Sequence, residues 1–263
     1  MINSLKINRL KILILPMEGV LVAYSGGVDS TLVLKVARDV LGEKVLAVTA
    51  KSPLYPACEL EAAKETAKGI GARHLIIESD ELKLPGFAKN PKNRCYLCKK
   101  ELFNRLGQIA GQEGLSYILD GSNASDTADV RPGRQAACEF GVRSVLEEAG
   151  VTKDEVREMS RKLGLPTYKK PSAACLASRL PYGKQITARA LRMVEEAEGH
   201  IKELGISQVR VRHYGNLCRI EVAKEEMPGF LKNREPIAAK LKELGYTYIT
   251  LDLCGYRTGS MNE

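Results

Sequence analysis

The sequence contains no tryptophan, only four phenylalanines and three scattered histidines among its 263 residues. Proteins that bind single-stranded nucleic acids stack bases on aromatic side chains along a basic groove. This chain has a formal net charge of +8, but its lysines and arginines are spread over helical patterns that also contain glutamate. Such a distribution is typical of solvated helix faces. The composition therefore gives no indication of a nucleic-acid partner.

A long apolar run is also missing. The most apolar early stretch, residues 12–15, ends at Pro16 and is far shorter than the roughly 20 residues that a membrane helix requires. No convincing secretory signal is present. We expect a protein without a membrane partner, located in the cytoplasm.

The seven cysteines are odd in number and occur without an export signal. This context favours reduced thiols, metal ligands or catalytic groups over a disulfide framework. Four of them lie in helical or strand patterns, where we expect buried packing: Cys58, Cys138, Cys218 and Cys254.

From Gly19 onward, short β-branched apolar runs alternate with amphipathic helical stretches. This pattern is typical of a doubly wound α/β fold, a parallel sheet wrapped by helices. The predicted strands are residues 20–24, 45–49, 74–78 and 117–120. The predicted helices between them are residues 30–40, 58–70 and 99–110. Thr152 and Glu155 form a capping box that opens a further helix, which ends before Gly164.

Residues 166–183 contain three prolines and show no clear periodicity. Loops of this length inside compact proteins are usually functional. A smaller α/β unit follows, with helices at 188–204 and 237–244, a hairpin turning near Gly215 and Asn216, and a strand at 248–251. We therefore predict two domains, residues 1–170 and 171–263.

The motif SGGVDS, residues 25–30, follows a buried strand and opens a helix. Glycines allow a sharp turn and a close approach to phosphate oxygens, and the free amides at a helix start stabilise their charge. The motif matches neither the GxxxxGK[ST] loop nor GxGxxG, which disfavours transfer of a terminal phosphate and hydride chemistry. The residues expected to bind the anion are Ser25, Gly26, Gly27 and Ser30.

Cys95 and Cys98 form a Cys-x-x-Cys pair at the head of a predicted helix, where a thiolate is favoured. A zinc site would need further ligands, but there is no second Cys-x-x-Cys and no histidine pair. With Cys175 from the long loop as a third thiolate, the set fits an iron–sulfur cluster that leaves one iron open for chemistry. A chance pair beside a buried Cys175 is the alternative.

SGGVDS is similar to the PP-loop of ATP pyrophosphatases, the adenine nucleotide alpha-hydrolase-like group that contains GMP synthetases, NAD synthetases and tRNA thiolases. The resemblance implies that ATP is split between its α and β phosphates, which leaves AMP on a substrate oxygen. It also implies that Asp29 lies near Mg²⁺ and pyrophosphate. Asp29 could also cap the helix, and the two roles are compatible.

Three blocks together resemble the LarE-type sulfur transferases: SGGVDS, DGSNASDTADVRPGRQAA from Asp120, and KPSAACLASRLPYG from Lys170. The resemblance covers nearly the whole chain. It implies an ATP-dependent enzyme that adenylylates a carboxylate of pyridinium-3,5-biscarboxylic acid mononucleotide and replaces it with a thiocarboxylate, in the synthesis of a nickel-pincer cofactor. The small-molecule mononucleotide substrate, a sulfide donor and a homo-oligomeric assembly are the expected partners.

The cysteine pattern separates two kinds of member. In some, one cysteine gives up its own sulfur and becomes dehydroalanine. In others, three cysteines that resemble Cys95, Cys98 and Cys175 bind a 4Fe-4S cluster that passes on a bound sulfide. This chain has the second pattern.

Further site residues are assigned on position and resemblance. Ser178 and Arg179 follow Cys175 and are expected to bind the anionic intermediate. Arg210 and Arg212 alternate on one strand and could hold a phosphate, or could belong to a solvated strand face. Glu198 and Glu221 resemble acidic residues near a metal. We expect five residues after the predicted strand at 117–120 to position the substrate and the nucleotide: Ser122, Asn123, Asp126, Asp129 and Arg131. The alternative is an Asx-type turn network in which Asp129 is paired to Arg131.

Two other functions share parts of this pattern. A tRNA thiolase has the same loop, but zinc-ribbon cysteines are absent at either end. An ATP-binding regulatory protein of the universal-stress type would have no need of the SGGVDS loop together with a Cys-x-x-Cys pair.

Overall fold

The structure, a computed structural model, describes residues 2–128, 132–171, 174–257 and 259–261. The chain forms two compact units. The first contains residues 1–79 and 93–173, and the second contains residues 80–92 and 174–263. The domain division expected at residue 170 stays a prediction, and nothing in the sequence pattern indicates that residues 80–92 group with the second unit.

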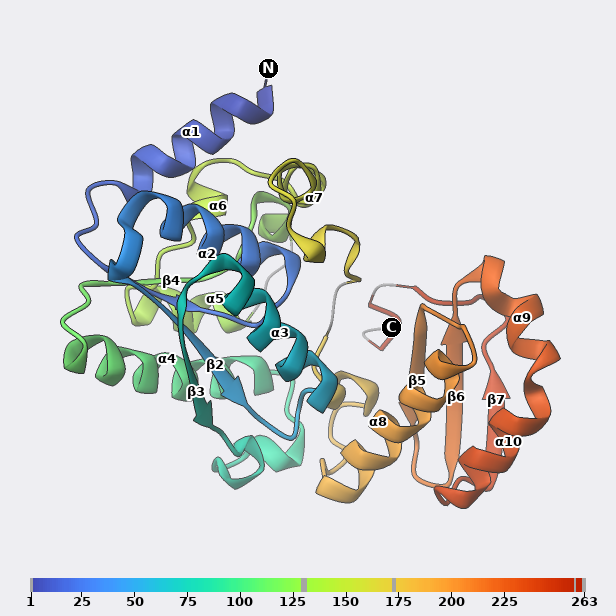
Figure 1. The fold of residues 1–263 in the computed structure, drawn as a ribbon. Coiled ribbons are helices and arrows are strands. Elements are labelled where there is room, and N and C mark those ends of the chain that lie inside the picture. The colour runs from blue at the N-terminus through green and yellow to red at the C-terminus, as the bar shows by residue number, and fades with distance from the viewer. Residues whose placement is uncertain (1, 129–131, 172–173, 258, 262–263) are drawn as a thin grey trace. The chain divides into compact units, whose positions relative to one another are not determined.

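The first unit is built on a parallel sheet in the order β3-β2-β1-β4 (Figure 1). Its strands are β1 (Val20–Ala23), β2 (Val45–Lys51), β3 (Arg73–Glu78) and β4 (Tyr117–Leu119). Both outward steps from β1 are parallel, as helical crossovers require. The predicted fold class is confirmed.

Helices cover both faces of this sheet. They are α1 (Ile2–Ile14), α2 (Val28–Leu41), α3 (Ala57–Ile70), α4 (Arg94–Gln112), α5 (Pro132–Glu139), α6 (Val145–Glu148) and α7 (Lys153–Lys162). Alternate residues of β1 feed two cores: Val20 and Val22 pack with α1, α2, α6 and α7, whereas Leu21 packs with α4 and α5. A strand with two buried faces explains why the sequence of β1 is apolar at every position.

The capping box is confirmed: the Thr152 side chain accepts from the Glu155 amide, and the Glu155 side chain accepts from the Thr152 amide. Lys6 of α1 also donates to Glu155 at 2.7 Å, which joins the first helix to α7. We did not predict α1. Its exposed residues include Leu5 and Ile12, at 67% and 69% exposure, so the helix lacks the one-sided apolar stripe that identifies an amphipathic helix.

The second unit contains a three-stranded sheet, with β5 (Val209–His213) antiparallel to β6 (Leu217–Val222) and β6 parallel to β7 (Tyr248–Leu251). The predicted hairpin is confirmed, since the Tyr214 amide donates to the Leu217 carbonyl at 2.9 Å. The helices of this unit are α8 (Ala188–Glu203), α9 (Met227–Lys232) and α10 (Arg234–Glu243). The described elements enclose a separate apolar core around Val209, Ile220 and Leu241.

Residues 80–92 belong to this second unit because their backbone pairs with the long loop. The Gly183 amide donates to the Asn90 carbonyl at 2.9 Å, and the Ile186 amide donates to the Ala88 carbonyl at 2.8 Å. The Asn90 side chain donates to the Pro181 carbonyl at 2.7 Å. Asn90 has φ +55, a left-handed conformation that asparagine tolerates better than most residues.

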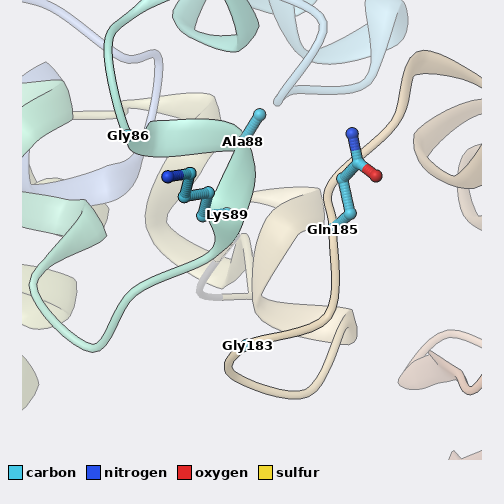
Figure 2. Close-up of a pocket in the computed structure, with 5 residues that line it drawn as sticks. All are labelled: Gly86, Ala88, Lys89, Gly183 and Gln185. Atoms are coloured by element: carbon cyan, nitrogen blue, oxygen red, sulfur yellow. The ribbon is translucent and has the colours of Figure 1, made fainter.

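A cavity of about 590 Å³ lies where these two segments face each other. It is lined by Gly86, Ala88, Lys89, Gly183 and Gln185. Figure 2 shows that the polar ends of Lys89 and Gln185 do not point toward each other. None of the residues assigned from the sequence lines it.

The cysteines depart from the expectation of burial. Cys218 is buried, as predicted, and burial raises the pKa of its thiol to about 12. The prediction is wrong for Cys58, Cys138 and Cys254, which are exposed. Cys58 lies in the first turn of α3, Cys138 on an outer face of α5, and Cys254 in a turn after β7. None of the seven cysteines, all of which are described, forms a disulfide.

No helix in the described part of the chain is long and apolar enough to cross a membrane.

Candidate functional site

The SGGVDS loop lies at the carboxyl end of β1 and leads into α2. Gly26 has φ +70, and a Cβ at this position would lie only 2.6 Å from the Ala63 Cβ of α3. Two independent constraints, the left-handed backbone and the lack of space, therefore require glycine here. The close approach fixes the course of the loop directly before the first turn of α2.

The first turn of α2 offers amides to an anion. Gly27 is the N-cap and makes no side-chain cap, so the amides that begin this 14-residue helix have no intrahelical acceptor. Together with the helix dipole, they favour a phosphate. The Ser25 and Ser30 hydroxyls lie 3.1 Å apart, and Ser25 Oγ accepts from the Gly27 amide at 3.3 Å. These contacts are long for hydroxyl hydrogen bonds, so a phosphate oxygen can replace them at little cost.

Asp29 does not cap the helix, and this alternative interpretation is wrong. Its carboxylate lies in the first turn of α2, where it accepts from Asn123 Nδ2 at 3.1 Å and forms an ion pair with Lys153. Asn123 is therefore brought to the loop, as its assignment requires. Sequence reasoning did not identify Lys153, whose partner lies 124 residues away in the chain.

The segment after β4 packs directly against the start of α2. A Cβ at Gly121 would lie 2.8 Å from the Ser30 amide nitrogen. Within the segment, Ser122 donates to Asp120 at 2.7 Å, and the Asn123 amide donates to Asp126 at 3.1 Å. These bonds resemble the alternative Asx-type turn network, and nucleotide contacts by Ser122 and Asp126 stay a prediction. Asp129 and Arg131 lie outside the described residues.

A second lysine missed by sequence reasoning contacts the loop itself. Lys170 Nζ donates to the Gly26 carbonyl at 3.1 Å and pairs with Glu59 of α3 at 2.7 Å. Lys170 lies in the block on which the resemblance rests, but the residue pattern alone assigned it no role.

A buried polar group supports the loop from β2 and β3. Thr49 Oγ1 donates to the Tyr24 carbonyl at 2.7 Å and lies 2.8 Å from His74 Nε2. Since the Thr49 proton is already used, His74 Nε2 must donate. Burial, and to a lesser degree the charge of Lys64, lowers the pKa of His74. Thr49, which itself accepts from His74, thus holds the residue before the loop.

In the second unit, Arg179 is fully engaged. Its Nε and one terminal nitrogen donate to both oxygens of Glu198, at 2.9 and 3.0 Å. The other terminal nitrogen donates to the Ala174 carbonyl, the Cys175 carbonyl and the Ser178 hydroxyl, at 2.7 to 3.0 Å. Glu198 also accepts from the Val211 amide at 3.0 Å. The pair therefore connects the backbone around Cys175 to α8 and β5.

Arg210 and Arg212 are both 6% exposed, so the alternative of a solvated strand face is wrong. Arg212 donates to Glu221 at 2.6 Å, to Ser260 Oγ at 2.9 Å and to the Ser178 carbonyl at 3.3 Å. Its Nε is buried with no hydrogen-bond partner among the described residues. Arg210 lies over the Tyr256 ring at 5.3 Å. Burial, followed by repulsion from Arg179, lowers the pKa of Arg210.

Glu198 and Glu221 are each balanced by arginine. A cation would have to displace a guanidinium from either carboxylate, so the geometry offers no support for their assignment as metal ligands. Within the described ranges, no group of three or more histidine, cysteine, aspartate or glutamate side chains is placed to hold a metal ion.

Cys95 lies in the first turn of α4 and Cys98 one turn later, three residues apart and thus on one side of the helix. Cys95 is exposed, whereas Cys98 and Cys175 are partly buried. The first two belong to the first unit, and Cys175 belongs to the second. Their joint role stays a prediction.

We predict that Gly26→Ala will weaken ATP binding at least tenfold and destabilise the first unit, because the loop must move away from Ala63. Gly71→Ala is the matched control. Gly71 has φ +75, but nothing lies within 4 Å of its Cβ position, so this variant should lose about 1 kcal/mol of stability and keep its ATP affinity. Equal ATP affinities for Gly26→Ala and the parent would contradict the role of the close contact.

We also predict that acid will destabilise the first unit through His74. A histidine whose pKa is lowered on folding contributes stability above its usual pKa near 6.5, and that stability is lost as the pH falls through the lowered folded-state value. His74→Gln should therefore unfold in urea with a smaller difference between pH 7 and pH 5 than the parent. His213→Gln is the comparison, because burial also lowers the pKa of His213 but in the second unit. An unchanged acid dependence of the first unit in His74→Gln would contradict the account.

Comparison with known proteins supports this geometry. The NAD synthase family matches residues 7–100, which contain the loop and its first supporting helices. Protein slr1717 of Synechocystis sp. is 46% identical over 94% of this chain and 92% of its own length. The pyridinium-3,5-bisthiocarboxylic acid mononucleotide synthase of Lactiplantibacillus plantarum is 39% identical over 94% of this chain and 90% of its own. Protein MJ0830 of Methanocaldococcus jannaschii is 28% identical over 91% of each chain.

Identity at this level over nearly the whole chain favours the sulfur transferases over both a tRNA thiolase and an ATP-binding regulatory protein. The resemblance found in the sequence is confirmed, and the chain belongs to the LarE-type family of ATP-dependent sulfur transferases that includes the pyridinium-3,5-bisthiocarboxylic acid mononucleotide synthase.

Proposed function

We propose that this enzyme adenylylates a carboxylate of pyridinium-3,5-biscarboxylic acid mononucleotide and replaces it with a thiocarboxylate, as a step in nickel-pincer cofactor synthesis. The proposal rests on the anion-binding loop at the start of α2, where Gly26 leaves no space for a side chain. This loop occurs in a chain that is 39% identical to a synthase named for the bisthiocarboxylic product. A carboxylate accepts a sulfur nucleophile poorly until AMP turns its oxygen into a leaving group.

The first unit is suited to the adenylylation. The acceptor carboxylate attacks the α phosphorus of ATP, and pyrophosphate leaves with its charge on the β and γ phosphates. The amides at the start of α2 favour that charge. Asp29 would supply oxygen ligands of the kind that Mg²⁺ prefers. Both of its oxygens already contact donors, Asn123 and Lys153, so Mg²⁺ would have to compete with the Lys153 ammonium.

The second unit is suited to an anionic substrate. Among the buried charges of α8, β5, β6 and the segment after Cys175, Arg179, Arg210 and Arg212 outnumber Glu198 and Glu221, and the Arg212 Nε has no hydrogen-bond partner among the described residues. A phosphate dianion near Arg210 and Arg212 would offset this positive charge with charge-assisted hydrogen bonds. We assign the phosphate of the mononucleotide to these two arginines.

Arg179 is assigned a positioning role. Its contacts with the carbonyls of Ala174 and Cys175 fix the backbone that carries the Cys175 thiol. Because Glu198 holds the guanidinium in place, loss of either partner would leave a buried charge and release this segment.

For sulfur delivery we propose that Cys95, Cys98 and Cys175 together bind a 4Fe-4S cluster. The donor set fits such a group, because soft thiolates suit iron and none of the three is in a disulfide. When bound through three cysteines, the cluster leaves one iron able to hold a sulfide. A sacrificial Cys175 would leave the Cys-x-x-Cys pair without a role.

This proposal includes an external sulfide donor, a homo-oligomeric assembly and a cytoplasmic location. Each follows from the family resemblance and from thiols that require a reducing compartment.

The test uses protein purified without oxygen and incubated with ATP, Mg²⁺, the mononucleotide substrate and sulfide. We expect the parent to contain bound iron and sulfide and to form thiocarboxylate over repeated turnovers. Both the iron and the product should be lost in the variants Cys95→Ser, Cys98→Ser and Cys175→Ser. Cys254→Ser, which removes another exposed thiol, is the control and should behave as the parent.

Mass spectrometry after turnover identifies the opposite outcome. If product stops at one equivalent per chain and Cys175 is about 34 Da lighter through loss of hydrogen sulfide, the cluster proposal is wrong and Cys175 is the sulfur donor. If no thiocarboxylate forms under any of these conditions, the proposed function itself is wrong.

A further inference from the structure

Lys170 is held beside the loop by the backbone of the first unit. It caps the 3₁₀ helix Pro166–Lys169, and its amide donates to the Thr167 carbonyl at 2.9 Å. Arg157 of α7 donates to the Tyr168 carbonyl at 2.9 Å and fixes the same short helix. The Lys170 side chain is therefore aimed from a fixed point.

The ammonium of Lys170 lies at the rim of the anion loop. It donates to the Gly26 carbonyl at 3.1 Å, and Gly26 immediately precedes the residue that caps α2. An ammonium has three N–H donors, and within the described residues two acceptors contact it, Gly26 and Glu59. The amides that would hold a phosphate belong to the residues that directly follow Gly26 in the chain.

The charges around the loop are balanced without a ligand. Asp29 is paired with Lys153 and Glu59 with Lys170, and all four side chains are only 18–27% exposed. A pyrophosphate group that enters this setting is a stronger acceptor for an ammonium than a single carboxylate, because it presents several charged oxygens. Lysine is suited to this as a compact, flexible point charge.

We propose that Lys170 is a pyrophosphate-binding residue of this enzyme, held ready by Glu59, which it leaves for the β and γ phosphates of ATP. The inference rests on the proposed function only in that the ligand of the loop is ATP. It adds a residue that touches the leaving group, and it gives Glu59 the role of a competing partner.

The experiment measures binding of Mg²⁺-pyrophosphate and, separately, of AMP to the full chain by calorimetry. In Lys170→Gln we expect the pyrophosphate dissociation constant to rise about tenfold, as loss of one charge-assisted hydrogen bond predicts, with AMP affinity unchanged. Lys169→Gln is the matched control. Lys169 is the preceding residue, is exposed and lies over the Tyr168 ring. Its replacement should change neither dissociation constant.

A second variant tests whether Glu59 competes with pyrophosphate for Lys170, and its effect on affinity should be opposite to that of Lys170→Gln. Glu59→Gln frees Lys170 and should tighten pyrophosphate binding, and this gain should vanish in the double variant Glu59→Gln/Lys170→Gln. A gain that persists in the double variant would mean a general charge effect, and no gain would mean no competition; either overturns the proposal.

Two further results would also overturn it. Unchanged pyrophosphate binding in Lys170→Gln would show that the ammonium does not contact the ligand. Parallel loss of AMP and pyrophosphate binding would show a structural role for Lys170 in the loop. This binding assay contains neither the acceptor nor sulfide. Failure of the proposed sulfur transfer would therefore not change its result, and the two proposals can fail separately.

Discussion

The contact between the Gly26 backbone and Ala63 of α3 determines what the first unit can bind. It holds the loop in a left-handed turn with no room for a side chain, directly before the amides that begin α2. Gly121 approaches the Ser30 amide from the other side with as little space. The anion site is thus defined by two positions where only backbone fits, and the side chains around it, Asp29, Lys153, Lys170 and Glu59, adjust its charge.

The second unit uses a different constraint, buried charge. Arg179 is joined to Glu198, and Arg212 to Glu221, in contacts that leave these side chains at most 7% exposed. Buried ion pairs add little net stability once desolvation is counted, so their value here lies in position. They tie the Cys175 backbone, α8, β5 and β6 together, and within these elements buried arginine outnumbers buried glutamate, a setting that suits a phosphorylated substrate.

Much of the fold could be predicted because the central strands β1 and β2 are buried on both faces. Continuous β-branched runs predicted the four parallel strands, and the glycines and hydroxyls of residues 25–30 identified the loop. What local pattern does not reveal is pairing across distance. Lys153 and Lys170 contact the loop from 124 and 144 residues away, and no periodicity predicts such contacts.

Burial is the other property that the local sequence pattern did not predict. Alternation placed Arg210 and Arg212 on one face. Only contacts with distant residues, those of Arg212 with Glu221 and Ser260 and that of Arg210 with the Tyr256 ring, make this face a buried one. Conversely, Cys58, Cys138 and Cys254 were expected inside from the general preference of cysteine, and each lies on an outer face or turn.

The central claim is that AMP is transferred to a carboxylate oxygen of the substrate, and an isotope measurement tests it most directly. The substrate carboxylates are labelled with heavy oxygen, and the AMP formed in a single turnover with ATP and sulfide is analysed by mass spectrometry. The account predicts that AMP carries one labelled oxygen for each thiocarboxylate formed, because sulfur displaces the adenylylated oxygen. Unlabelled AMP, or ADP in place of AMP, would contradict it.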